Sequence, residues 1–402
     1  MSKSEVPGPG APEAREAAPE AREAAREAAA PEAAALAYPC GEPPAPGAPK
    51  EIAPGVLWLR MPLPFALNHI NLYLLDDEVD GRAGWAVVDT GTQTPDVLAA
   101  WRTLLAPGAG SPLAGRPITR VFATHMHPDH MGMAGWLTRK YDARLWMTRE
   151  EYLMCRTLVA DTGREAPDDA IDFYRRCGWP EEALDVYRAR FGGFGKYVHA
   201  LPDSFRRIVD GERLAIGGNE WRVVVGRGHS PEHASLVCEH LGIMISGDQV
   251  LPRISSNVSV FPTEPDADPL GEWLASIADL RARLPAELLV LPAHGEPFRG
   301  LHARLDRLAA GHARSLARLK RSLAAEPKRV IDIFGTLFAR PIDTRSEQLG
   351  LATGEGVAHL NHLVQRGEVV AEAAADGALR YRLADADAAA AAAAAEAVAA
   401  PE

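Results

Sequence analysis

The chain has 402 residues, of which 47% are hydrophobic, and a formal net charge of −11. This acidic balance disfavours broad nonspecific binding to nucleic acid or anionic membranes, and no apolar stretch is long enough to span a bilayer. Single cysteines at positions 40, 155, 177 and 238 signal neither a zinc knuckle nor a disulfide framework. Because the N-terminal residues lack the apolar region of a secretory signal, we expect a cytoplasmic protein.

Both ends of the chain are low in sequence complexity. Residues 1–48 consist mainly of Ala, Glu, Pro and Arg, with APEAREA twice in succession, which predicts a disordered tail. Residues 385–402 form a second, Ala-rich tail. Between the tails we expect a large domain at 49–300, a connecting helix at 301–326 and a compact C-terminal unit at 327–384.

Short β-rich runs and helical segments alternate through the large domain. HINLYLL (69–75), WAVVDTG (85–91) and ITRVFATH (118–125) have strand character, and TPDVLAAWRTLL (94–105) has helical character. Strands followed by helices predict an α/β sandwich. A helical insertion at about 148–198 interrupts the series. We expect its aromatic residues to pack in the core in preference to walling a substrate pocket: Tyr152, Tyr174, Trp179 and Tyr187.

The segment FATHMHPDHMGMAG (122–135) holds three of the chain's 13 histidines. If the preceding residues form a strand that runs into a loop, His125 and His127 project to the same side and can bind one metal ion. Asp129 and His130 then continue around the loop towards a second ion. Imidazoles with a carboxylate suit Zn(II) and also accept Fe or Mn.

Three later apolar runs each end on a residue type that binds metals. WRVVVGRGH ends on His229, IMISGD on Asp248 and LLVLPAH on His294. Functional side chains that project from strand ends onto shared loops are a common way to build a site on a rigid scaffold. Together with the histidine cluster, these endings indicate one metal centre.

In this order and at these intervals, HxHxDH, GHS, SGD and AHG resemble the motifs of the metallo-β-lactamase superfamily, with a glyoxalase II-like motif set. The resemblance covers roughly residues 50–300 and implies an αββα sandwich that binds two divalent metal ions, with Zn(II) favoured over Fe or Mn. It implies that the first ion is bound by His125, His127 and His229 and the second by Asp129, His130 and His294. The carboxylate of Asp248 would bridge the two ions.

Further roles follow from the same resemblance. Asp89 would orient the ligands from behind. A hydroxide bridging the two metals would attack the substrate, and Asp129 would act both as ligand and as proton shuttle. Asp129 and Asp248 are thus the expected catalytic residues.

The unit at 327–384 resembles, in the order of its elements, a small winged-helix domain that follows the catalytic domain in one branch of this superfamily. Its helix at 355–367 carries few cations, so packing or dimerisation is favoured over nucleic-acid binding. We expect solvent exposure for the histidines on the predicted helices: His302, His312, His359 and His362.

Candidate substrate-binding residues follow or adjoin the ligand motifs. Arg253, Ser255 and Asn257 could bind a substrate anion or carbonyl. The alternative, that they only make ordinary hydrogen bonds within their loop, is equally favoured. His233 could line the pocket or support the ligands. For His69, packing within a strand is favoured over a place in the site.

These observations predict a binuclear metal-dependent hydrolase. The favoured substrate is a small-molecule thioester, an acyl-CoA or acyl-glutathione, or a related ester or lactone. A metal-dependent endoribonuclease or phosphodiesterase is the alternative, and it would need a cationic path, for which the basic pairs 139–140 and 206–207 are the nearest candidates. The intact ligand set disfavours a non-enzymatic binding protein, and a homodimer remains open.

Overall fold

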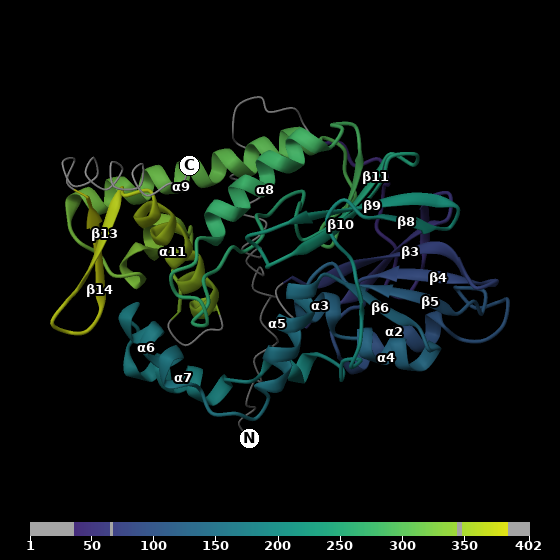
Figure 1. Ribbon diagram of the computed structural model, residues 1–402, viewed down its shortest axis with the longest axis horizontal. Coiled ribbons are helices and arrows are strands. Elements are labelled where there is room, and N and C mark those ends of the chain that lie inside the picture. The colour runs from purple at the N-terminus through teal and green to yellow at the C-terminus, as the bar shows by residue number, and fades with distance from the viewer. Residues whose placement is uncertain (1–35, 65–66, 344–347, 385–402) are drawn as a thin grey trace, which may run out of the picture.

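The computed structural model describes residues 36–64, 67–343 and 348–384. Within these residues, two β-sheets face each other and helices cover the outer face of each (Figure 1). The expected α/β class is therefore confirmed. Residues 1–35 and 385–402 of the expected tails lie outside the described residues.

The first sheet has seven strands in sequence order. Its neighbours pair antiparallel from β1 to β4 and parallel from β4 to β7. The strands are β1 (Lys50–Ala53), β2 (Val56–Pro62), β3 (His69–Val79), β4 (Arg82–Val88), β5 (Ile118–Phe122), β6 (Arg144–Met147) and β7 (Arg206–Arg207).

The second sheet has five strands in the order β12-β11-β10-β9-β8. The pair β11 and β12 is parallel and the other pairs are antiparallel. The strands are β8 (Arg213–Ile216), β9 (Asn219–Gly226), β10 (His233–Cys238), β11 (Ile243–Gly247) and β12 (Leu289–Pro292).

Alternating residues of the strands build separate cores on the two faces of each sheet. In β3, Leu72 and Leu74 face the helices, whereas Tyr73 and Leu75 face the second sheet. Because side chains alternate across a strand, one strand of consecutive apolar residues can serve both cores. This explains why HINLYLL is almost continuously apolar.

Helices complete the layers. The first sheet is covered by α2 and α4, and the second by α8 and α9. The helices of the large domain are α2 (Pro95–Leu104), α3 (Pro128–Met131), α4 (Ala134–Tyr141), α5 (Arg149–Ala160), α6 (Asp168–Arg176), α7 (Glu181–Arg190), the 3₁₀ turn η1 (Phe194–Tyr197) and α8 (Pro269–Arg283).

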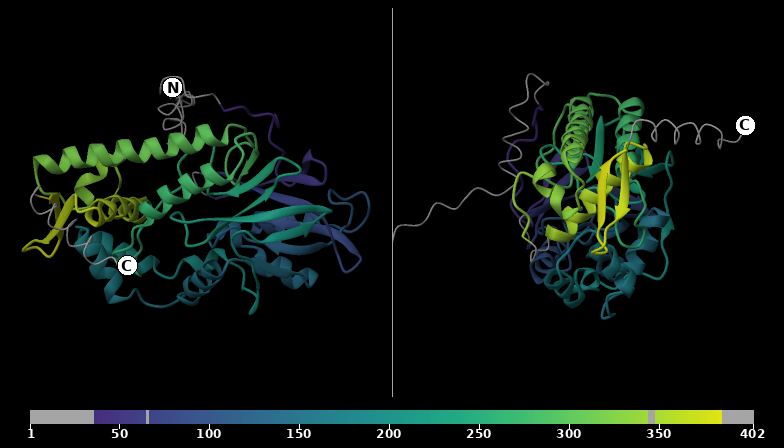
Figure 2. Two further views of the ribbon diagram at one scale, coloured as in Figure 1. Left: turned by 45° about the horizontal axis from the view of Figure 1, so that its top comes forward. Right: turned by 90° about the vertical axis from the view of Figure 1, so that its left-hand side faces the viewer.

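The long helix α9 (Leu301–Ala325) leads from the sheets to the C-terminal unit, as Figure 2 shows. That unit consists of helices followed by a two-stranded antiparallel hairpin, and its winged-helix character stays a prediction. Its elements are η2 (Ile331–Ile333), α10 (Phe334–Leu337), α11 (Gln348–Gln365), β13 (Val369–Ala373) and β14 (Leu379–Leu383).

The helical insertion packs against the C-terminal unit. Tyr174 and Trp179 are buried in the same apolar core as Ile333 and Leu360, and Trp179 Nε1 donates to Thr353 Oγ1 at 2.9 Å. In Figure 1, α6 and α7 accordingly lie next to α11. The expected core role of these aromatic residues is confirmed.

Two expectations about the termini and helices need correction. Residues 36–48 belong to the folded part of the chain, because Ala37 and Arg299 exchange backbone hydrogen bonds of 3.2 and 2.8 Å. The histidines at 312, 359 and 362 are buried, since α9 and α11 pack on other elements along these faces. No helix in the described part of the chain is long and apolar enough to cross a bilayer.

Candidate metal centre

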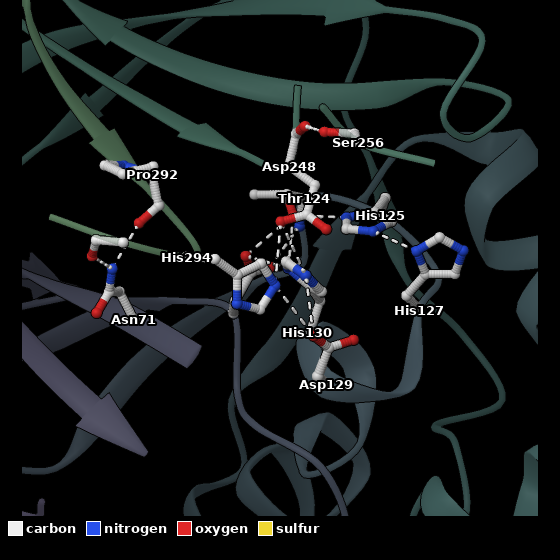
Figure 3. A network of polar contacts seen from close by, with 12 residues as sticks. Asn71, Thr124, His125, His127, Asp129, His130, Asp248, Ser256, Pro292 and His294 are labelled. Carbon is white, nitrogen blue, oxygen red and sulfur yellow. Dashed lines mark hydrogen bonds and ion pairs between the residues drawn. The ribbon is translucent and has the colours of Figure 1, made fainter. Parts of the chain in front are cut away.

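The ligand-type residues of the sequence motifs meet beside the ends of four strands (Figure 3). His125 and His127 follow β5, and Asp129 and His130 lie in the single turn of α3. The later strands β9, β11 and β12 lead to the other three: His229, Asp248 and His294. Residues far apart in sequence thus share one site.

Four of these side chains form a first group: His125, His127, His229 and Asp248. His125 Nε2 lies 2.8 Å from His127 Nδ1 and 3.2 Å from His229 Nε2. Nitrogen ligands of a tetrahedral zinc ion lie about 3.3 Å apart, given Zn–N bonds of about 2.0–2.1 Å. The spacing therefore suits three imidazoles on one ion.

The second group contains Asp129, His130 and His294. Asp129 Oδ2 lies 3.4 Å from His294 Nε2 and 3.6 Å from His130 Nε2. Asp248 reaches this group as well, because its Oδ1 is 3.4 Å from His294 Nε2 while its Oδ2 is 3.5 Å from His229 Nε2. The two groups are adjacent, with Asp248 between them.

Hydrogen bonds fix which nitrogen of each ring carries a lone pair. Oxygen acceptors hold the Nδ1–H groups of three histidines: Asp89 for His130 at 2.7 Å, Asn257 O for His229 at 2.7 Å and His69 O for His294 at 2.9 Å. The Nε2 atoms of these rings then point into the site as lone-pair donors. This is the tautomer that binds a metal ion.

The residues present fit a pair of cations. His130 Nε2 and Asp248 Oδ1 are buried and, within the described residues, make no hydrogen bond, although they lie 3.6 Å apart. Buried polar atoms without a partner are costly. A cation bound between His130 Nε2 and Asp248 Oδ1 would relieve this cost.

Burial and the neighbouring charges shift the pKa values of the ligand-type side chains. Burial and then the neighbouring imidazoles lower the pKa of His127 to about 3. Burial opposes ionisation of Asp129, but His130 and His294 together outweigh it and the pKa of this carboxyl falls to about 2. Burial opposes protonation of His130 and His294 as well, but the surrounding carboxylates outweigh it and raise the pKa of both rings. A metal ion at the second group would therefore displace protons, because neutral imidazoles and ionised carboxylates are the forms that coordinate metals.

Asp89 supports the ligands from behind. Its carboxylate accepts hydrogen bonds from Thr124 N at 2.8 Å, Thr124 Oγ1 at 2.9 Å and His130 Nδ1. Its backbone has φ of 62°, a left-handed conformation that non-glycine residues seldom adopt. This conformation at the end of β4 turns the carboxylate under the histidine loop.

Glu151 at the start of α5 is a supporting residue that the sequence did not reveal. The carboxylate is fully buried and accepts from Met126 N at 2.9 Å, Ser230 Oγ at 2.6 Å and Glu232 N at 2.8 Å. Met126 lies between two ligands, and Ser230 follows a third. Glu151 therefore joins the two loops that carry the histidines of the first group.

His69 lies closer to the metal centre than the expected packing within a strand would place it. Its Nε2 accepts from Gly295 N at 3.2 Å, next to His294, and its ring centroid is 6.4 Å from that of His294. Asn71 Nδ2 donates to Gly295 O at 2.7 Å. The first residues of β3 thus anchor the last ligand loop, a contact between segments too distant in sequence to predict.

The expected substrate-binding residues have other partners. Arg253 is exposed and pairs with Glu296 at 2.9 Å, and Ser255 is exposed with its hydroxyl 3.4 Å from Ser256 O. His233 is fully buried and its Nε2 accepts from Asp248 N at 3.1 Å, which favours the supporting role over contact with substrate. Substrate binding by Arg253, Ser255 and Asn257 stays a prediction.

Family models match two parts of the chain. The model described as the metallo-beta-lactamase superfamily matches residues 67–294, which hold all seven ligand-type side chains. A model described as the metallo-beta-lactamase-like C-terminal domain matches residues 316–384. The C-terminal unit is called the C-terminal domain below.

Known proteins resemble the chain over most of its length. A beta-lactamase domain protein from Burkholderia ambifaria is 42% identical, with a TM-score of 0.78 over 87% of this chain and 98% of its own. A metallo-beta-lactamase family protein from Thermus thermophilus is 27% identical, with a TM-score of 0.68 over 83% of this chain and all of its own (100%).

Curated sequences add two relatives. "Probable metallo-hydrolase YqjP" of Bacillus subtilis is 24% identical over 77% of this chain and 92% of its own length. The atrochrysone carboxyl ACP thioesterase of Aspergillus fumigatus is 26% identical over 60% of this chain and 41% of its own length.

Proposed function

The chain belongs to the metallo-β-lactamase superfamily and is a metal-dependent hydrolase, and from this premise we propose that it uses two metal ions to hydrolyse thioesters of small acyl groups. The observation that carries the proposal is the position of the Asp248 carboxylate, with Oδ2 3.5 Å from His229 Nε2 and Oδ1 3.4 Å from His294 Nε2. One side chain reaches both ligand groups, as a binuclear site requires.

His125, His127 and His229 would hold one ion and Asp129, His130 and His294 the other, with Asp248 shared. Divalent ions there, Zn(II) before Fe or Mn, supply an activated water and polarise the thioester carbonyl. Water adds to the acyl carbon, the C–S bond breaks, and a carboxylic acid and a thiol leave.

Asp129 is the residue best placed to move the proton. Its side chain is 20% exposed, whereas the imidazoles of its group are almost fully buried. Its pKa of about 2 keeps it ionised at neutral pH, so it would hold a proton from the activated water only briefly before passing it to solvent or to the leaving thiolate. A thiol leaving group needs little assistance, because its own pKa is about 8.5.

Three observations favour an acyl substrate over a phosphodiester. A relative that aligns with 60% of this chain bears the name of an acyl carrier protein thioesterase. Basic residues that could form a cationic path already have partners: Arg206 pairs with Glu212, Arg139 donates to Ala200 O, and Lys140 lies over Trp136. The net charge of −11 gives no attraction for RNA.

The test is hydrolysis by the purified protein after loading with zinc, iron or manganese. Substrates are acyl-CoA, acyl-glutathione and phosphopantetheine thioesters, a lactone and a single-stranded RNA. We expect thioester turnover that is lost in Asp248→Ala and kept in Asp96→Ala, which removes an exposed carboxylate on α2. Cleavage of RNA alone would reject the thioester proposal.

A further inference from the structure

The segment between β11 and α8 connects the metal centre to the C-terminal domain. The main-chain oxygen of Asn257 accepts the Nδ1–H of His229 at 2.7 Å, and the opposite nitrogen of that ring faces His125 and Asp248. Residues 249–260 contain no regular helix or strand. The direction of the Asn257 carbonyl must therefore be fixed by contacts outside its own segment.

Arg304 of α9 donates to the main-chain oxygens of Leu251 and Ile254, and helix α11 contacts residues 257–260. Glu355 Oε2 accepts from Asn257 Nδ2 at 3.0 Å, and Val260 N donates to Gly354 O at 3.1 Å. At Gly354 a Cβ atom would stand 2.7 Å from Ser259 Oγ, so this segment lies directly against the helix. Ser259 Oγ in turn donates to the Asn257 side chain.

The backbone around Glu355 is held in place. The main-chain oxygen of Glu355 accepts from His359 Nδ1 at 2.9 Å, and the adjacent Thr353 is fully buried against Trp179 of the insertion. His359 in turn lies 3.5 Å from His312 of α9. The helix is thus fixed from two sides at the turn from which the Glu355 carboxylate reaches the Asn257 amide.

We propose that Glu355 of the C-terminal domain is a positioning residue for the metal ligand His229, acting through the Asn257 amide and carbonyl. The inference rests on the metal centre of the proposed function. It adds to that centre a residue that lies outside the ligand motifs. Without Glu355, Asn257 loses the charge-assisted hydrogen bond that orients it, and the His229 ring loses a fixed acceptor. The C-terminal domain then belongs to the metal centre as well as to the fold.

The experiment measures metal affinity, with Zn(II) in competition with a chromophoric chelator and Co(II) absorption spectra to resolve the two sites. In Glu355→Ala we expect affinity at one of the two sites to fall between about 10-fold and 100-fold, the usual cost of losing a residue that orients a metal ligand. Affinity at the other site should stay within about 2-fold. Glu355→Gln keeps an oxygen acceptor for Asn257 and should retain most of the affinity.

Asn361→Ala is the matched control. Asn361 lies on the same helix and donates to Pro265 O and Ala267 O, both at 2.9 Å, so this variant also loses contacts between α11 and the catalytic domain, but none to a ligand. We expect unchanged metal affinity in Asn361→Ala.

Equal affinity in Glu355→Ala and wild type would overturn the inference. So would an equal loss in Asn361→Ala, or a loss at both sites in Glu355→Ala, since each would mean general loosening of the domain contact. A wild type that binds no metal would overturn the proposed function and this inference together.

Discussion

Buried histidines gather in two regions of this molecule, and only one of the two is built as a metal centre. Beside the strand ends, imidazole nitrogens converge and carboxylates lie among them. Where α9 packs against α11 of the C-terminal domain, His312 Nδ1 lies 3.5 Å from His359 Nε2, while His359 Nδ1 donates to Glu355 O and His362 pairs with Asp268 at 3.0 Å. These rings bond to one another, to a main-chain oxygen and to one carboxylate.

The difference shows what distinguishes a metal centre from a packed histidine cluster. Histidines are buried in both regions, so burial alone does not distinguish them. Within the described structure, only the first region combines three properties. Its ring nitrogens converge on one point, carboxylates among them supply negative charge, and oxygen acceptors hold the Nδ1–H groups of three rings. Variants can test each of these properties.

Matched histidine substitutions should separate the two regions most strongly. His125→Asn removes a ligand, so we expect loss of one metal ion and a fall in kcat of at least about 10³-fold, the scale typical of losing a catalytic group. His362→Asn removes a buried histidine that pairs with Asp268 and should keep both ions. Metal content by mass spectrometry and the rate of hydrolysis check this pair. Metal loss in His362→Asn would show that the second region also binds metal.

The pH dependence of stability tests the role of Glu151, which joins the two histidine loops of the first region. Burial raises the pKa of Glu151 to about 7, above the ordinary 4.5, so the folded protein binds a proton more tightly than the unfolded chain. Its contribution to the free energy of unfolding is therefore present at low pH and falls as pH rises from about 4.5 to 7. In metal-free protein we expect this free energy, relative to Glu151→Gln, to fall by about 3 kcal/mol across that window.

Denaturant unfolding of both metal-free proteins at several pH values measures this difference. A difference that does not change with pH would mean that Glu151 stays ionised in its buried position. The Gln variant should also bind metal more weakly, because its side-chain amide cannot accept from all three donors.

The second region predicts the opposite pH dependence. Burial, followed by the charges of His359 and His362, lowers the pKa of His312 to about 3, so the folded protein resists protonation that the unfolded chain accepts near 6.5. The stability contributed by neutral His312 is complete above pH 6.5 and is lost as pH falls. Relative to His312→Gln, we expect a loss of about 2 kcal/mol between pH 6.5 and 5.

Thermal and denaturant unfolding of metal-free wild type and His312→Gln provide the measurement. Parallel pH profiles would show that His312 is protonated in the folded protein despite its burial.

The smallest effect is expected where the insertion meets the C-terminal domain. Trp179→Phe keeps the ring packing but removes the hydrogen bond to Thr353, which should cost about 1 kcal/mol. A double-mutant cycle with Thr353→Val isolates this bond from changes in packing. Metal affinity should not change, because neither residue contacts a ligand or its acceptor. Zero coupling energy would mean that the bond adds nothing to stability.

The α/β class and the ligand-type residues could be predicted from the sequence because their signals are local. Each of β9, β11 and β12 is an apolar run that leads to a His or Asp, and the pair at 125 and 127 has the spacing of a shared face. Supporting residues carry no such signal. The acceptor for His229 is a main-chain oxygen 28 positions away, and Asn257 and Glu355 are separated by 98 positions.

Burial of the C-terminal histidines was mispredicted for a related reason. An isolated helix gives no information about which elements cover it, and His312, His359 and His362 are covered by each other's helices and by α8. Glu151 was missed because a glutamate in the first turn of a helix is also common on surfaces. Only its three donors, from two distant loops, reveal its role.

The pairing of Ala37 with Arg299 has a consequence for the order of events during synthesis. A chain that leaves the ribosome N-terminus first exposes residue 37 long before its partner, and the ligands become available one at a time between positions 125 and 294. The Glu355 carboxylate follows later still. Neither the bridge nor the full set of ligand-type side chains can assemble until residues 294–299 have emerged, about three-quarters of the way along the described chain, so metal acquisition comes late in the synthesis of this protein.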